Sequence, residues 1–445
     1  MNMKVRLKFI VALGLLTIGV SPLLYAQTDT IHLTVQKAVD LAIQQNLMQK
    51  VSELELQKKQ EKVGEYMAAL YPTVKATGSY SRYLKLPVIF LPAGSPLGTT
   101  LKVGSDNSYT GAVSASVPVF VASIFESIRL GKKDAEISAE KVRENQINLA
   151  ADIKTTYYNV LLLKRSSEVI GQSYQNALDN LKNIQNLNKN GMVSDYDVIR
   201  IKVQVENLYP NLLQTENSYD NLLNVLKILL NIDVNTPVSL DDGEVTNLEV
   251  AEGVLPTDGW QDANSTLRQL YLSSQMLDIQ AKLVKSSNIP SLVAIGSYQY
   301  QAQANNFKFS DYKWVPTSLV GLQLNVPIFS GFSVRRQLSQ VRISQQELAL
   351  QTEFTQNNLN TQLQNEVNAI NTAVKKVNSA VGNVDLAQRG YSIAKTSYNT
   401  GQATLLELND AENAMMQARL NLIQAQIEYL TARADYEKTI GKELQ

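Results

Sequence analysis

The stretch YNTGQATLLELNDAE, residues Tyr398–Glu412, interrupts a long helical pattern with a glycine and then starts a new helix. The stretch NKNGMVSDYDVIR, residues Asn188–Arg200, does the same earlier in the chain. The two glycines, Gly191 and Gly401, lie 210 residues apart (401 − 191). Two turns of one kind at a long fixed offset are typical of a duplicated architecture, so we expect two repeats.

A capping box follows each glycine. Ser194 precedes Asp197 by three positions, and Thr404 precedes Glu407 in the same way. In such a pair the hydroxyl accepts a hydrogen bond from the backbone N–H of the acidic residue, while the carboxylate accepts one from the N–H of the hydroxyl residue. We therefore expect a new helix to begin directly after each glycine turn.

The helices after the two turns carry matching apolar positions. From Val198 to Leu222, residues of one face recur in steps of three and four, which is the spacing of helices that supercoil against a neighbour. The series from Leu408 to Ala432 falls on the same positions when it is shifted back by 210 residues. Pro210 lies within the first of these helices and predicts a kink rather than an end.

Composition argues against several classes of function. Lys plus Arg number 41 and Asp plus Glu also number 41, so no excess of basic residues predicts nucleic-acid binding. The 445 residues include no cysteine, which excludes disulfides, thiolate metal sites and cysteine nucleophiles. His32 is the single histidine, so we expect neither a clustered-histidine metal site nor a Ser-His-Asp triad. We predict no enzymatic activity, no cofactor and no metal.

The first 26 residues have the pattern of a secretory signal peptide. Basic residues come first (Lys4, Arg6 and Lys8), and the apolar run Phe9–Val20 follows, with the expected cut after Ala26. That run is too short to span a bilayer comfortably, and no later stretch has the length and apolarity of a membrane helix. A membrane-embedded form of the exported protein would therefore have to be a β-barrel.

Four segments alternate polar and apolar residues as strands do. They lie at about 73–84, 109–119, 291–301 and 317–327, and each has about the 9 to 11 residues that a tilted strand needs to cross a bilayer. The tripeptide Gly-Ser-Tyr occurs in the first and third strands, at 78–80 and 296–298. The second and fourth end in Val117-Pro118-Val119-Phe120 and Val326-Pro327-Ile328-Phe329. Aromatic residues gather around the strands, as in an interfacial girdle.

The chain therefore divides into two repeats. The first, 27–235, holds a helix from Thr34 to about Leu70, two strands and long helices at about 124–190 and 195–230. A connector at 236–262 follows, rich in proline, glycine and acidic residues, whose acidic cluster Asp241–Glu244 we interpret as a solvated turn. The second repeat, 263–445, holds a helix, two strands and long helices at about 331–399 and 404–440.

With these features together, the chain resembles the TolC-like outer-membrane efflux proteins. The resemblance implies a mainly α fold with a β-barrel part: a homotrimer with a shared barrel of 12 strands (3 × 4) in the outer membrane of a Gram-negative cell and a periplasmic α-helical tunnel. It implies a passive exit channel for drugs or toxic small molecules, supplied by an inner-membrane transporter through a periplasmic adaptor protein. Independently of it, four strands cannot close a barrel with a lumen, so the strands need partners from other copies.

The resemblance also assigns candidate site residues. Acids six and nine positions after the second glycine, Glu407 and Asp410, would form the pore constriction, where rings of carboxylates favour cations. For Glu407 alone we favour the simpler explanation, that it completes the capping box and complements the helix dipole. In the first repeat Arg200 stands where Asp410 would map, so we expect one acidic pair per subunit. Contacts between the two hairpins in the closed state would involve Tyr398 and Asp197.

The two turns are the expected docking points for the adaptor: Gly191, Met192 and Val193 in the first repeat, and Gly401, Gln402 and Ala403 in the second. The family usually has a basic residue where this chain has Ala403, so the closed-state contacts here must differ in detail.

Two other functions stay open at this point. The same architecture serves type I secretion, in which the cargo is an unfolded polypeptide. A periplasmic coiled-coil adaptor or structural protein without a pore would also show the heptads, although such adaptors usually carry one hairpin and no bilayer-length strands. An enzyme is disfavoured because no combination of base, nucleophile and metal ligands occurs.

Overall fold

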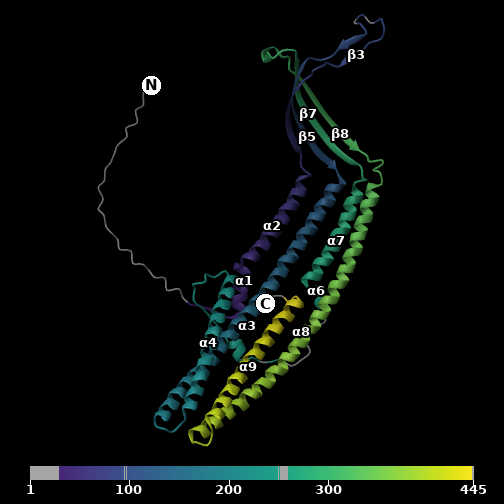
Figure 1. Cartoon of the computed structure of the whole chain (residues 1–445). Helices are drawn as coiled ribbons and strands as arrows, with labels where there is room; N and C mark the ends of the chain where they lie inside the picture. The colour runs from purple at the N-terminus through teal and green to yellow at the C-terminus, as the bar shows by residue number, and fades with distance from the viewer. Residues whose placement is uncertain (1–29, 95, 97, 249, 251–258, 443–445) are drawn as a thin grey trace, which may run out of the picture.

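The computed structural model describes residues 30–442 apart from 95, 97, 249 and 251–258. The molecule is elongated, with a β-sheet at one end and two long helical hairpins reaching the other (Figure 1). The signal peptide predicted for residues 1–26 lies outside the described residues. Within the described ranges, we find no helix with the length and apolarity required to cross a membrane.

The sheet is antiparallel and has four strands in the order β2-β5-β7-β8. The strands are β2 (Thr73–Arg82), β5 (Asn107–Phe120), β7 (Ser291–Ala304) and β8 (Val315–Asn325), within three residues of the ranges expected from alternation. Pairing of β5 with β7 joins the two halves of the chain in one sheet. The loop from β2 to β5 adds a small hairpin, β3 (Val88–Phe90) and β4 (Thr100–Lys102), that projects beyond the sheet (Figure 1).

Each half continues from the sheet into a long helix and returns in a shorter one. The first hairpin is α3 (Ala122–Lys189) followed by α4 (Asp195–Leu229), and the second is α8 (Ser333–Asn399) followed by α9 (Leu405–Thr439). At 1.5 Å per residue, the 68 residues of α3 span about 100 Å. The bounds of α4 and α9 differ by 210 residues at both ends (405 − 195 and 439 − 229). Helix α4 continues through Pro210.

The segment predicted as one helix from Thr34 to about Leu70 is two helices, α1 (Val35–Gln45) and α2 (Leu47–Ala68). Asn46 separates them, and its side-chain oxygen accepts hydrogen bonds from the backbone N–H of Met48 and Gln49, which caps α2. Its Nδ2 donates to the carbonyl of Leu229 at the end of α4 (2.8 Å). The break therefore anchors the start of α2 to the first hairpin, which apolar periodicity does not reveal.

The connector has more structure than the sequence predicted. It contains β6 (Val238–Leu240), which pairs in parallel with β1 (Ile31–Leu33), and the short helices α5 (Gly243–Thr246) and α6 (Trp260–Ala263), before α7 (Ser265–Ser286) begins. Its acidic cluster is also packed rather than simply solvated. Asp242 accepts a hydrogen bond from Arg165 of α3 (2.8 Å), and this contact lowers the pKa of the Asp242 carboxyl. Glu244 accepts one from Tyr158 of α3 (3.1 Å).

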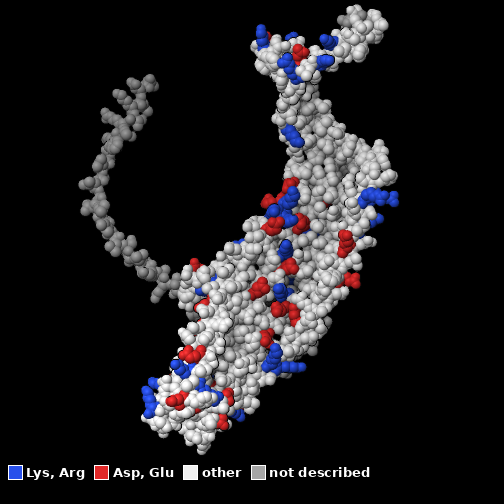
Figure 2. Space-filling view, in the orientation of Figure 1, with Lys and Arg blue, Asp and Glu red and all other residues white. Residues whose placement is uncertain are grey.

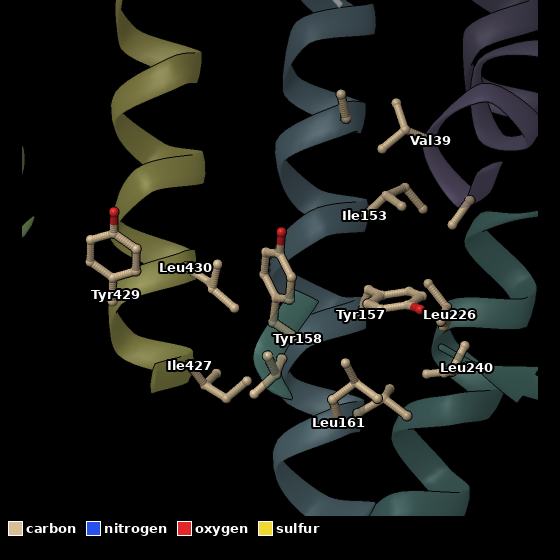
Figure 3. Close-up of a cluster of buried hydrophobic side chains, with 14 of the residues drawn as sticks. Val39, Ile153, Tyr157, Tyr158, Leu161, Leu226, Leu240, Ile427, Tyr429 and Leu430 are labelled. Atoms are coloured by element: carbon tan, nitrogen blue, oxygen red, sulfur yellow. The ribbon is translucent and has the colours of Figure 1, made fainter. Parts of the chain in front are cut away.

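The main core lies midway along the molecule, where α1, α3, α4, β6, α8 and α9 meet, and Figure 3 shows part of it. Tyr157 of α3 is fully buried there, and its hydroxyl lies 2.7 Å from the carbonyl oxygens of Leu33 and Asp241. One phenol thus joins the ends of β1 and β6 to the long helix. Leu226 and Leu240 lie beside Tyr157, and Ile427 and Leu430 of α9 lie on the side of the neighbouring Tyr158 (Figure 3). Other apolar members of the same core are Val39, Ile153 and Leu161.

Arg143 of α3 holds the end of the chain against this central region. Its guanidinium donates hydrogen bonds to the carbonyl of Ala263 (3.0 Å), the hydroxyl of Ser265 (3.2 Å) and the carbonyl of Gly441 (3.2 Å). Gly441 has a left-handed backbone (φ 65°), and a Cβ at this position would lie 2.3 Å from the Ala263 oxygen. The start of α7 and the end of α9 therefore meet at one cation, which only glycine at position 441 allows.

Replacing Arg143 with Met should lower the free energy of unfolding by about 2 to 3 kcal/mol, because two backbone carbonyls and a hydroxyl lose a charged donor. The melting temperature of the detergent-extracted protein measures this loss. Arg129→Met is the matched control, because Arg129 is 61% exposed and pairs with Glu126 within one helical turn. The control should change the free energy of unfolding by about 0.5 kcal/mol or less. Equal effects of the two substitutions would contradict the role assigned to Arg143.

Candidate functional site

The sheet has one apolar face and one polar face. Antiparallel partners share a face, so the strand register places every residue. A typical apolar row runs Val74, Ala115, Gly296 and Val320 across the four strands. The rows next to it are mainly polar: one is Lys75, Ser114 and Ser297 with the apolar Leu319, and the other is Thr77, Ala112, Gln299 and Thr317.

Both faces are open. Every residue of β2 is exposed, as is every residue of β8 except Gly321. On the apolar face Val320, Leu322 and Leu324 are 90%, 70% and 63% exposed. Lys75 and Arg82 are the two charged residues in the four strands, and Figure 2 shows the strand region as nearly free of charge between charged helices and charged loops. Apolar area of this extent is stable only against lipid or another apolar surface.

Aromatic side chains mark both ends of the apolar face. At the loop end the rings of Tyr80 and Tyr109 stack with centroids 4.9 Å apart, and Tyr312 lies 5.3 Å from Tyr109. Tyr298 and Tyr300 of β7 form a second pair there (5.4 Å). At the helix end the exposed aromatic residues are Tyr71, Phe120, Phe329 and Phe332. Two aromatic bands that flank an apolar band are the pattern of a strand region that crosses a membrane.

The two outer strands of the sheet are unpaired on one side. Within the described residues, β2 pairs with β5 alone and β8 with β7 alone. Each edge, 10 residues in β2 and 11 in β8, therefore presents a row of backbone N–H and C=O groups. Such edges pair readily with another chain, and in lipid an unpaired edge is prohibitively costly. Both edges are thus free to pair with further β-strands.

The far ends of the hairpins have the two predicted turns. Gly191 and Gly401 have φ of 73° and 74°, the left-handed conformation that favours glycine. Backbone N–H groups just past them donate back to the helix ends, Met192 to Leu187 (2.9 Å) and Gln402 to Ser397 (2.8 Å). Both predicted capping boxes are confirmed at the starts of α4 and α9. The two triplets Gly191-Met192-Val193 and Gly401-Gln402-Ala403 form the tips.

Glu407 and Asp410 lie in the first turns of α9, and both side chains are exposed. The Glu407 carboxylate accepts hydrogen bonds from the backbone N–H (2.7 Å) and the hydroxyl (3.0 Å) of Thr404. These bonds lower the pKa of Glu407, so the residue stays ionised at neutral pH. The capping role of Glu407 is therefore present, and it leaves the charge at the surface next to Asp410.

Tyr398 and Asp197 approach each other where the hairpin ends meet. Tyr398 packs against a small buried cluster of Ile184, Ile201 and Leu405, which come from α3, α4 and α9. Burial raises the pKa of Tyr398, and the charge of Asp197 raises it further. Asp197 itself accepts hydrogen bonds from Ser194 in its capping box. The two hairpins of one chain are thus in contact close to their tips.

A buried acid in α9 is not evident from the sequence pattern. Glu412 is 1% exposed and Asn409 is 4% exposed, and both lie within the stretch that reads as an acid-rich helix start. Glu412 is the eighth residue of α9, and a charged residue is normally solvated, so the sequence alone predicts exposure. In the described part of the chain, no three His, Asp or Glu side chains are grouped so that they could hold a metal ion.

Comparison with known proteins agrees with this geometry. The family model "Outer membrane efflux protein" matches residues 38–231 and 261–442. The outer membrane protein TolC of Escherichia coli is 23% identical over 386 residues, which cover 78% of this chain and 76% of that protein. The alkaline protease secretion protein AprF of Pseudomonas aeruginosa is 23% identical over 338 residues, 74% of this chain and 68% of AprF.

Solved structures share the fold. The Campylobacter jejuni CmeC outer membrane channel superposes with a TM-score of 0.74 at 17% identity, covering 92% of this chain and 85% of CmeC. The Vibrio cholerae outer membrane protein VceC gives a TM-score of 0.71 at 14% identity, covering 92% and 97%. The family model spans most of the chain, and the sheet carries the two faces that such channels need. The chain therefore belongs to the outer membrane efflux protein family and is an outer-membrane member of the TolC group.

Proposed function

We propose that this protein is the passive exit channel of a tripartite export system. The observation that carries the proposal is the exposed sheet with one apolar face, one polar face and two unpaired edges. Copies of the chain pair β8 of one with β2 of the next, so that the closed barrel has lipid on its apolar face and water on its polar face. The long helices then continue the duct away from the membrane.

We infer three copies. Three sheets of four strands give a barrel of 12 (3 × 4), which is wide enough for a water-filled lumen, whereas one sheet cannot close around any lumen. The hairpins of three chains would then line one helical tunnel in the periplasm. The even strand number and antiparallel pairing agree with closure of such a barrel.

The channel needs partners, because a water-filled duct only lets solutes move down a gradient. An inner-membrane transporter supplies the energy, and a periplasmic adaptor joins transporter and channel. The adaptor would contact the tips, Gly191–Val193 and Gly401–Ala403, since these lie at the end of the hairpins farthest from the sheet (Figure 1). At the same end, Tyr398 and Asp197 hold the hairpins together in the closed channel, while Glu407 and Asp410 line the constriction.

The cargo is proposed to be small toxic molecules. Relatives named for antibiotic and toluene efflux match over 84% of this chain, and AprF, named for protease secretion, represents the alternative of protein cargo. Deletion of the gene distinguishes small-molecule cargo from protein cargo. Greater sensitivity to small toxic compounds, with unchanged secreted protein, supports efflux, whereas loss of a secreted protein alone supports secretion.

The two faces of β8 predict opposite outcomes at neighbouring positions. Leu322→Arg places a charge on the lipid-facing side and should destabilise the folded barrel by about 2 to 4 kcal/mol, whereas Gln323→Arg points into the lumen and should be tolerated. The yield of folded, protease-resistant protein in outer membranes measures both. Equal yields, or a selective loss with Gln323→Arg, would contradict the assignment of the faces.

The constriction is tested by single-channel recording in planar bilayers. Glu407→Gln combined with Asp410→Asn should weaken cation selectivity, because three copies lose six carboxylates around the axis (3 × 2). Glutamine can still complete the capping box, so the helix start should survive. The control is Glu216→Gln with Asp220→Asn, two exposed acids of α4 that remove the same charge away from the tips. Unchanged selectivity in the first double variant would move the constriction elsewhere, and absence of any pore in the folded wild-type protein would overturn the channel.

A further inference from the structure

The contact between the two hairpins of one chain, which we term the inter-hairpin seam, is apolar on both sides of a buried acid. Nearest the tips, Ile184 and Ile201 of the first hairpin enclose Leu405 of α9. Farther from the tips, Met416 of α9 packs against a cluster formed by Ala177, Val205 and Leu208 of the first hairpin. Glu412 lies between these two contacts along α9, one helical turn before Met416.

Glu412 is buried without a charged partner in contact with its carboxylate. The residue is 1% exposed, and both of its oxygens are buried with no hydrogen bond among the described residues. The amide of Asn176 faces it from α3. The oxygen of that amide accepts a hydrogen bond from Gln172 (3.0 Å), so its NH2 group is the neutral donor that faces the carboxylate. One neutral donor compensates only in part for the loss of water around a buried carboxylate, whereas a protonated carboxyl is tolerated far better.

Few charges face this acid. Helix α3 contributes the neutral Asn176, and α8 contributes Tyr391 and Lys395. Lys395 is an exposed residue whose ammonium lies 5.7 Å from the ring centroid of Tyr391. None of the ion pairs in the described chain includes Glu412. On α9 itself, Arg419 donates its hydrogen bond to Gln388 of α8 (2.7 Å).

From this geometry we propose that Glu412 is a proton-controlled latch between the hairpins. The seam closes around the neutral acid, and ionisation of the acid favours separation of the hairpins, which brings the carboxylate into water. The proposal rests on the proposed function in one respect: separation of the hairpins near their tips is what opens the duct.

The direction of the pH effect follows from burial. Burial raises the pKa of Glu412 in the closed seam, and Asn176 and Lys395 offset part of this rise. In the separated, hydrated seam the pKa returns toward its ordinary value of 4.5. Below that value the acid is neutral in both states, and closure has its full stability. As the pH rises through the higher pKa of the closed state, ionisation favours the separated state by up to tenfold for each unit between the two pKa values.

The absence of cysteine from the sequence allows a direct test. Leu405→Cys introduces a single thiol into the seam. Leu405 is 7% exposed and packs against Ile184 and Ile201 of the first hairpin, so rapid alkylation by N-ethylmaleimide requires separation of the hairpins. The alkylation rate of the full-length detergent-extracted protein is divided by the rate of the same protein in denaturant at the same pH, which removes the intrinsic pH dependence of the thiol. Rates are compared with Glu412 present and with Glu412→Gln.

At about pH 8 the protein with Glu412 should be alkylated at least about tenfold faster than the Glu412→Gln protein. At about pH 5 the two alkylation rates should converge. Glu412→Met should behave as Glu412→Gln does, which keeps the test decisive if the amide is poorly tolerated. Glu206→Gln removes an exposed carboxylate from α4 and should leave the rate unchanged.

Equal rates with Glu412 and both replacements at both pH values would overturn the latch. Faster alkylation of the Glu412→Gln protein at pH 8 would also overturn it, since the ionised acid would then hold the seam closed, for example through Lys395. The alkylation rate tests the latch, and the single-channel conductance tests the proposed channel function. The two proposals can therefore be rejected independently of each other. A conducting channel with pH-independent alkylation removes the latch alone.

Discussion

The requirement that every backbone N–H and C=O group be hydrogen-bonded in lipid governs this molecule. The four-stranded sheet meets that requirement inside but not at β2 and β8, whose outer edges are unpaired among the described residues. Its apolar face, with Leu322 70% exposed, likewise finds no core within the chain. On these grounds we propose that the single chain is a segment of a larger closed surface. The polar face, lined by serine, threonine and glutamine, is the side that such closure leaves to water.

The helical part has a tightly packed region near its middle and a less packed region toward the tips. Near the middle, Tyr157 and Arg143 join the long helix α3 to backbone carbonyls from distant segments, and a large apolar core surrounds Tyr157 (Figure 3). Toward the tips, the contact between the hairpins narrows to small clusters around Leu405 and Met416. Stability is thus concentrated where the chain must hold its shape, and the tips can rearrange at lower cost.

Much of this architecture was predictable from the sequence, because the signals were periodic or local. Alternation located all four strands, and the glycine turns and capping boxes at Ser194 and Thr404 located the hairpin ends. The features that were missed depend on tertiary contacts. Asn46 breaks a helix because its amide reaches Leu229, and β6 exists because it pairs with β1, 207 residues earlier (238 − 31). The burial of Glu412 likewise depends on the packing of α3 and α8 against α9, which the sequence pattern does not reveal.

The account requires that copies of this chain close the sheet edge to edge. The mass of the mature protein, extracted from outer membranes in mild detergent and measured by native mass spectrometry, tests that requirement most directly. Three times the mass of one chain is the expected result, because three sheets supply a barrel with a lumen. A folded protein with the mass of a single chain would contradict the account, since the edges of β2 and β8 would then be unpaired in the membrane.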